Sequence, residues 1–302
     1  MRSSSLARRL AVATAATTLL LIVAGGLVTN TGAGLAVPDW PTTFGYNMFT
    51  YPWSAMVGGV FYEHSHRLLG SLVGLLTLAL AAALWPLGGR LRVLGLVAVA
   101  SVILQGVLGG LRVTLLELRL AIVHGCLAQA YFALVVAIAV LAWPRAAETS
   151  DGLARDEGLA TLTSVAAALV YVQIVFGALL THTGRLHLHL IGALAVFALV
   201  PIVTARARRT GDALARTTSI ALLALLGVQL VLGAGAWVGR FTDVVFPGGT
   251  TTGLALPVLH RLVGSLILGA STVLVLRVRL GGRAARASGG VPRLAPAGRS
   301  AT

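Results

Sequence analysis

Eight apolar segments, each long enough to cross a bilayer as a helix, dominate this chain of 302 residues. A transmembrane helix needs roughly 20 mainly apolar residues, and it satisfies its own backbone hydrogen bonds in lipid. The segments cover residues 9–29, 66–86, 93–111, 121–143, 159–181, 187–205, 217–239 and 258–278. The sequence therefore predicts an all-α integral membrane protein with eight transmembrane helices.

The chain has a net charge of +14, and all of its lysine-or-arginine positions are arginine. Such a charge can indicate nucleic-acid binding, but these arginines gather in short loops between apolar segments, which excludes that class. With the N-terminus placed in the cytoplasm, all but six of the 23 arginines fall on the inner side. The positive-inside rule then predicts cytoplasmic N- and C-termini in the cell inner (plasma) membrane.

An internal repeat relates the two halves of the sequence. The first and fifth segments end in Thr-Asn-Thr-Gly (29–32) and Thr-His-Thr-Gly (181–184), and a glutamine precedes a glycine by four residues in three odd-numbered segments. Residues four apart share a helical face. We expect two pseudo-symmetric four-helix bundles, 1–144 and 159–282, joined by a cytoplasmic linker, 145–158, and followed by a disordered cytoplasmic tail, 283–302. The repeated glycines indicate close helix packing, which also admits a flat macrocycle.

Four histidines stand near the outer starts of the even-numbered segments: His66, His124, His189 and His260. Ionisable residues at membrane depth are costly and are usually functional. Two of the four begin nearly identical phrases, His-Arg-Leu-Leu-Gly-Ser-Leu and His-Arg-Leu-Val-Gly-Ser-Leu. The repetition indicates two metal-centred sites, although a helix–helix hydrogen bond is an alternative role for His124.

Neighbouring residues add further candidates. Glu63 lies three residues before His66 and so shares its helical face; the alternative is a carboxylate that merely reaches interfacial water. His64 and His187 are reserve ligands. We expect Arg67 and Arg261 either to pair with an acidic group of a cofactor or to extend toward the interface.

The donor set favours haem among the metals. Imidazole suits haem iron, copper or zinc, whereas a zinc site normally takes three or four close protein ligands. The single cysteine, Cys126, excludes a cysteine-rich centre. Two histidines per half fit bis-histidine binding of a haem inside a four-helix bundle.

An outer loop after the first segment carries the motif Pro38-Asp39-Trp40-Pro41 within an aromatic stretch. Proline and glycine around this motif predict a turn. We expect a lid over a site or an anchor at the membrane interface.

These motifs resemble the haem A synthase family. The likeness covers about residues 15–280 and rests on the loop 29–41, on Glu-His-Ser-His-Arg at 63–67 and on a histidine in each later even-numbered segment. The resemblance implies an eight-helix enzyme that oxidises the C8 methyl group of haem O to a formyl group, with water as the expected oxygen source. The product, haem A, serves cytochrome oxidases.

The resemblance also implies roles for the candidate residues. His189 and His260 would ligate a haem b cofactor, while His66 and His124 would flank the substrate haem iron. Glu63 would assist proton transfer or orient a neighbour. Candidate partners are haem O synthase and a quinone or another membrane electron acceptor, and self-association into a homo-oligomer stays open.

The chain departs from the family pattern in two respects. It lacks the cysteine pair that some members carry in an outer loop, and His189 is not followed by an arginine. Two other functions stay open. One is a di-haem b-type electron-transfer protein that needs no Glu63, and the other is a haem carrier without redox chemistry.

Overall fold

Eight membrane-spanning helices make up most of the computed structural model, which describes residues 2–143 and 148–289. Each is long and apolar enough to cross a bilayer, so the chain is an all-α multi-pass membrane protein. Within the described residues no strand forms, and only an isolated bridge joins Thr43 to Tyr46.

The helices follow one another through short connections, except for the long loop 31–58. In chain order they are α1 (Arg2–Asn30), η1 (Trp53–Ala55), α2 (Gly59–Leu84), η2 (Trp85–Leu87), α3 (Gly89–Thr114), α4 (Leu118–Leu141), α5 (Asp151–Arg155), α6 (Glu157–Thr183), α7 (Leu186–Arg209), α8 (Ala213–Phe241) and α9 (Thr250–Gly289). Several helices extend beyond the apolar segments because polar and small residues at their ends continue the helical hydrogen bonding.

Local signals place the helix ends. Asp156 and Asp212 cap α6 and α8, their carboxylates accepting hydrogen bonds from the backbone N–H of Leu159 (3.0 Å) and Ala215 (2.8 Å). These contacts satisfy amide groups that the first turn leaves unpaired. Gly184 ends α6 with a φ of 73°, a left-handed conformation that glycine adopts without steric cost.

Two apolar clusters hold the helices together. One joins α1–α4 and includes Val73, Leu80 and Ile138, and the other joins α6–α9 and includes Leu159, Val200 and Leu222. Helix α9 also packs against α1 and α4, and α4 packs against α6. The pseudo-symmetry of the halves and their domain boundaries stay predictions.

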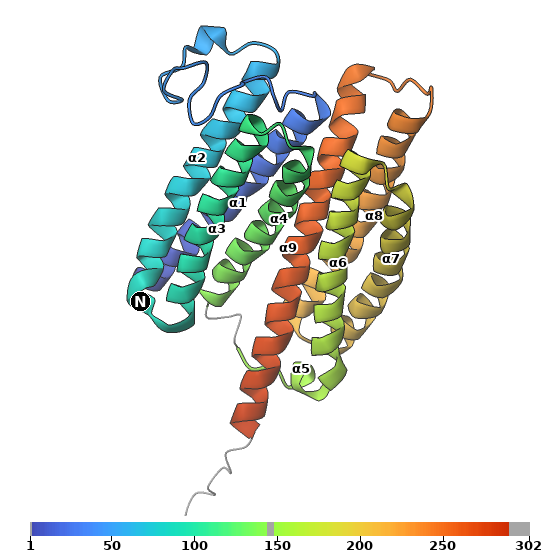
Figure 1. The fold of residues 1–302 in the computed structure, drawn as a ribbon. Helices are drawn as coiled ribbons and strands as arrows, with labels where there is room; N and C mark the ends of the chain where they lie inside the picture. Colours follow the sequence, from blue (N-terminus) through green and yellow to red (C-terminus); the bar gives the residue numbers. More distant parts are fainter. Residues whose placement is uncertain (1, 144–147, 290–302) are drawn as a thin grey trace, which may run out of the picture.

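The two ends of the helix array differ in character (Figure 1). We call the end that carries residues 31–58 the loop end, and the opposite end, where the chain begins, the tail end. Ion pairs fix the tail end: Arg277 pairs with Asp212, both nearly inaccessible, and Arg206 pairs with Asp156.

The predicted disordered tail is wrong for residues 283–289, which continue α9 to Gly289. Alanine and arginine favour helix, and this turn packs on α5. Ala285 is buried, and the Arg286 guanidinium donates a hydrogen bond to the carbonyl oxygen of Ala154 (3.2 Å). Residues 290–302 lie outside the described residues. The predicted linker 145–158 is partly helical as well, since α5 occupies 151–155 and α6 begins at Glu157.

Candidate functional site

Two pairs of histidine rings face each other between helices. His66 on α2 lies with its ring centroid 6.3 Å from that of His124 on α4, and the rings are inclined by 72°. His189 on α7 and His260 on α9 form the second pair, with centroids 6.1 Å apart and an angle of 66°. The structure thus brings together the four histidines that the repeat singled out, in the combinations 66 with 124 and 189 with 260.

A glycine on a neighbouring helix faces each imidazole. A Cβ atom on that glycine would lie only 2.9–3.4 Å from the histidine Cε1 atom. The four glycine–histidine pairs are Gly25 with His66, Gly109 with His124, Gly177 with His189, and Gly233 with His260. The repeated glycines therefore make room for the imidazole rings, which is more specific than the helix packing predicted for them.

Glutamines hold three of the histidine positions. The Gln173 amide nitrogen lies 3.0 Å from His189 Nδ1 and donates to the His189 carbonyl oxygen at 2.9 Å. Gln229 places its amide nitrogen 3.1 Å from His260 Nε2. Gln105 donates to the carbonyl oxygen of His124 at 3.1 Å. Each glutamine bridges two helices at the level of an imidazole.

The paired rings fit an iron bound by two imidazoles. Metal–imidazole bonds are roughly 2 Å long, so two such bonds and the two ring radii span about 6 Å, close to both centroid separations. His66 Nδ1 and His124 Nδ1 are buried and have no hydrogen-bond partner among the described residues. Buried polar nitrogens are rarely left unpaired without a reason, and a metal ion held between the two rings would give each imidazole a partner. No group of three or more histidine, cysteine, aspartate or glutamate side chains in the described ranges could hold a metal ion.

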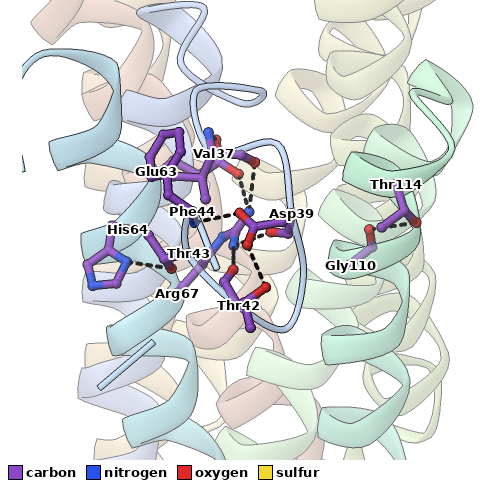
Figure 2. A network of polar contacts seen from close by, with 10 residues as sticks. All are labelled: Val37, Asp39, Thr42, Thr43, Phe44, Glu63, His64, Arg67, Gly110 and Thr114. Carbon is purple, nitrogen blue, oxygen red and sulfur yellow. Dashed lines mark hydrogen bonds and ion pairs between the residues drawn. The ribbon is translucent and has the colours of Figure 1, made fainter. Parts of the chain in front are cut away.

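Glu63 and Arg67 tie α2 to the loop 31–58 (Figure 2). One Glu63 carboxylate oxygen accepts from the Val37 N–H at 3.0 Å, and the other accepts from Arg67 at 2.8 Å. The Arg67 guanidinium also donates to the carbonyl oxygens of Asp39 (2.7 Å) and Thr42 (3.0 Å) and to that of Val37. This network holds the loop against the first turns of α2.

His64 belongs to the same attachment. Its side chain is 1% exposed, its Nδ1 lies 3.1 Å from the Thr43 hydroxyl, and its ring lies 5.1 Å from that of Tyr51. His64 therefore anchors the loop and does not join His66 and His124. The other reserve candidate, His187, is exposed on α7.

The Pro-Asp-Trp-Pro motif forms a turn that covers α3. The Asp39 carboxylate accepts hydrogen bonds from the N–H groups of Phe44 (2.7 Å) and Gly45 (2.9 Å) and from the Thr42 hydroxyl. Trp40 lies on Gly110, where a Cβ atom would clash with the indole ring. The loop is thus packed onto the end of the bundle, as a lid would be.

Burial alone would raise the pKa of the Asp39 carboxyl. The backbone N–H of Gly45, the Thr42 hydroxyl and the N–H of Phe44 outweigh that effect and hold the pKa below its ordinary value of 3.8. Asp39 is therefore charged at neutral pH.

The arginines at the loop end differ in whether their guanidinium groups have hydrogen-bond partners. The Arg67 guanidinium donates hydrogen bonds to Glu63 and to the loop. The Arg261 guanidinium makes no hydrogen bond or ion pair with any described residue and lies near Gly26. Arg112, at the end of α3, lies against Gly34 and lines a cleft of about 310 Å³ with Asn30, His182 and Arg240. This cleft joins the loop ends of α1, α3, α6 and α8. His182, near the end of α6, contributes to it.

Sequence reasoning overlooked Arg112 and gave the glutamines no role. Arg112 carries no motif, and only the folded loop shows that it lies at the site. The Gln–Gly spacing was visible in the repeat, but its meaning depends on which histidine each helix faces. Which histidine each helix faces depends on the packing of helices that are distant in sequence, so spacing alone does not reveal it.

Comparison with known proteins identifies relatives of this chain. A family model described as COX15-CtaA, cytochrome oxidase assembly protein, matches residues 8–185. A heme A synthase of Shouchella clausii is 36% identical over 106 residues, covering 34% of each chain. Those of Beijerinckia indica and Alkalihalophilus pseudofirmus are 32% and 28% identical over 197 and 170 residues, covering 53% and 55% of this chain.

The match reaches 34%, 54% and 56% of the lengths of these three relatives. The family model, in contrast, covers more than half of the present chain, including α1–α4, the loop 31–58 and α6. On that basis, the chain belongs to the COX15-CtaA family of cytochrome oxidase assembly proteins, the haem A synthase family.

Proposed function

We propose that this protein is a haem A synthase, an oxidoreductase that converts the C8 methyl group of haem O to a formyl group. The observation that carries the proposal is the presence of two unlike histidine pairs, only one of which adjoins the Glu63–Arg67 attachment of a loop. An enzyme with one substrate haem and one cofactor haem needs such a difference. The names of the three relatives support the same activity.

In this proposal the pair His189 and His260 would hold a resident haem b, which would supply electron transfer. The pair His66 and His124 holds the iron of the substrate haem. Arg261 and Arg112, whose guanidinium groups form no ion pair with a described residue, would pair with haem propionates. The Arg67 guanidinium is instead occupied by Glu63 and the loop.

Glu63 acts in this account as a positioning residue. Both of its carboxylate oxygens already accept hydrogen bonds, so it orients Arg67 and the loop over the substrate. Water supplies the oxygen, and a quinone or another membrane acceptor takes the electrons. Haem O synthase is the partner that delivers substrate, and the loop end faces the outside of the plasma membrane.

Pigment extraction from a host supplied with haem O tests the proposal. Haem A should accumulate with the intact chain, fall to background with His66→Ala, and fall at least tenfold with Glu63→Ala. Glu63→Gln is the matched variant, because an amide oxygen still accepts from Val37. We expect Glu63→Gln to keep part of the activity if Glu63 positions the loop, whereas a proton-transferring Glu63 makes Gln as inactive as Ala. No haem A from the intact, membrane-inserted chain would refute the proposal.

A di-haem b-type electron-transfer protein is the second candidate. The near-equal ring separations in the two pairs, 6.3 and 6.1 Å, favour it. Such a protein would retain two b haems after purification and leave haem O unchanged.

A further inference from the structure

One histidine lacks the glutamine that accompanies the other three. Glutamine stands four residues before the facing glycine on α3, α6 and α8, but on α1 the position four residues before Gly25 is Leu21. Leu21 is partly buried and packs on the apolar cluster of α1–α4. Its side chain offers no donor or acceptor to His66, and only the Leu21 backbone carbonyl lies beside that ring.

The structure shows what the glutamines do at the other positions. Gln173 contacts both the ring and the backbone carbonyl of His189, and Gly192 leaves the space for its amide. The Gln229 amide nitrogen lies beside Gly264, 3.4 Å from where a Cβ atom would stand, and also contacts His260. Each amide therefore restrains an imidazole and joins its helix to the next. Such outer contacts orient metal-binding histidines and increase retention of the metal.

The His66 position provides a matched comparison within the same molecule. Gly70 occupies the place in the phrase at 66–72 that Gly264 occupies in the phrase at 260–266. No described atom outside its own helix turn lies within 4 Å of a Cβ built on Gly70. His66 Nδ1 is buried and has no side-chain hydrogen-bond partner among the described residues. A backbone carbonyl lies beside both rings, that of Leu21 at His66 and that of Gln229 at His260 (3.2 Å), so what His66 lacks is the side-chain amide contact seen at His260.

We propose that Leu21 makes His66 the exchangeable ligand of the substrate haem, so that the pair His66 and His124 releases product while the pair His189 and His260 keeps its haem. This inference rests on the proposed function. Turnover of a haem that is itself the substrate requires one ligand to leave and rebind. A leucine beside that ligand lowers the barrier, since no amide contact has to break.

Haem transfer from the purified full-length chain to excess apomyoglobin tests this, with the transferred pigment identified by chromatography as haem O, haem A or haem b. Leu21→Gln should slow the release of haem O and haem A about three- to tenfold, the effect of one hydrogen bond, and leave haem b release unchanged. The reciprocal variant Gln229→Leu should speed haem b release by a similar factor. Leu10→Gln, about three turns away on the same cluster, is the control and should change neither rate.

The outcomes separate the inference from the proposed function. If the wild-type chain releases haem O freely but Leu21→Gln and Gln229→Leu leave both rates unchanged, the inference is wrong and the function stands. If Leu21→Gln cannot be purified, the rate for Gln229→Leu alone decides. A wild-type chain that holds only haem b at both pairs refutes the proposed function itself.

Discussion

At the scale of single residues, the histidine sites depend on glycines as much as on histidines. The imidazole of His260 is the most confined, with a Cβ on Gly233 only 2.9 Å from its Cε1, whereas the corresponding distance for Gly177 and His189 is 3.4 Å. Contacts below about 3 Å force a neighbour to move, and overpacking typically costs about 1–3 kcal/mol.

This difference predicts unequal effects of the same substitution. Gly233→Ala should displace the His260 ring and increase the haem b dissociation rate roughly tenfold. Gly177→Ala should change that rate less than about twofold, because its methyl group makes an ordinary contact. Haem transfer to apomyoglobin measures both rates. Equal rates for the two variants would show that the glycines do not confine the rings.

Residue-level roles were the hardest to predict from sequence. The spacing identified the four histidines and Glu63, because rare polar residues stand out in apolar segments. It did not reveal the partners of Arg67, since Val37 and Asp39 lie 30 and 28 positions away along the chain. Nor did it show that the backbone of Leu21 lies beside His66, which follows only from the packing of α1 on α2.

At the scale of elements, the loop 31–58 has a defined fold that packs on the helices and is more than a spacer. Asp39 closes its turn, Arg67 and Glu63 fasten it to α2, and Trp40 rests on α3. Sequence predicted the turn and a lid or an anchor, whereas the contacts show how the loop is attached. Apolar length predicted the eight helices, but α9 extends past the expected end because its last turns pack on α5.

The Asp39 turn predicts an acid-sensitive loop. A carboxyl whose pKa is lower in the folded loop than its ordinary 3.8 stabilises the loop above that pH, and the stabilisation is lost as the pH falls through the folded value. Trp40 is 40% exposed in the folded loop, so in a variant with Trp40 as the single tryptophan acrylamide quenching should be partial at pH 7 and increase below about pH 4.

Asp39→Asn is the control for this titration. The neutral amide cannot support the three donors as a carboxylate does, so quenching should be stronger at pH 7 and nearly independent of pH. If Asp39→Asn and its parent gave the same pH profile, the turn would not depend on the Asp39 charge.

At the scale of the whole molecule, the two halves carry similar histidine pairs in different surroundings. The first pair has the loop, Glu63 and Leu21, and the second has a glutamine at each histidine. Helix α9 contacts α1 and α4, and the arginine-lined cleft lies between the loop ends of both halves. This asymmetry is what an enzyme with one exchanging and one resident haem requires.

The most direct test of this account measures the haem content of the purified chain and of its four single histidine-to-alanine variants. The haem A level of each host is measured alongside. His189→Ala and His260→Ala should lose the resident haem b. His66→Ala and His124→Ala should keep haem b with an unchanged spectrum, yet yield no haem A. Loss of tightly held haem b from all four variants alike, with no haem A from the intact chain, would contradict the account and indicate a di-haem electron-transfer protein.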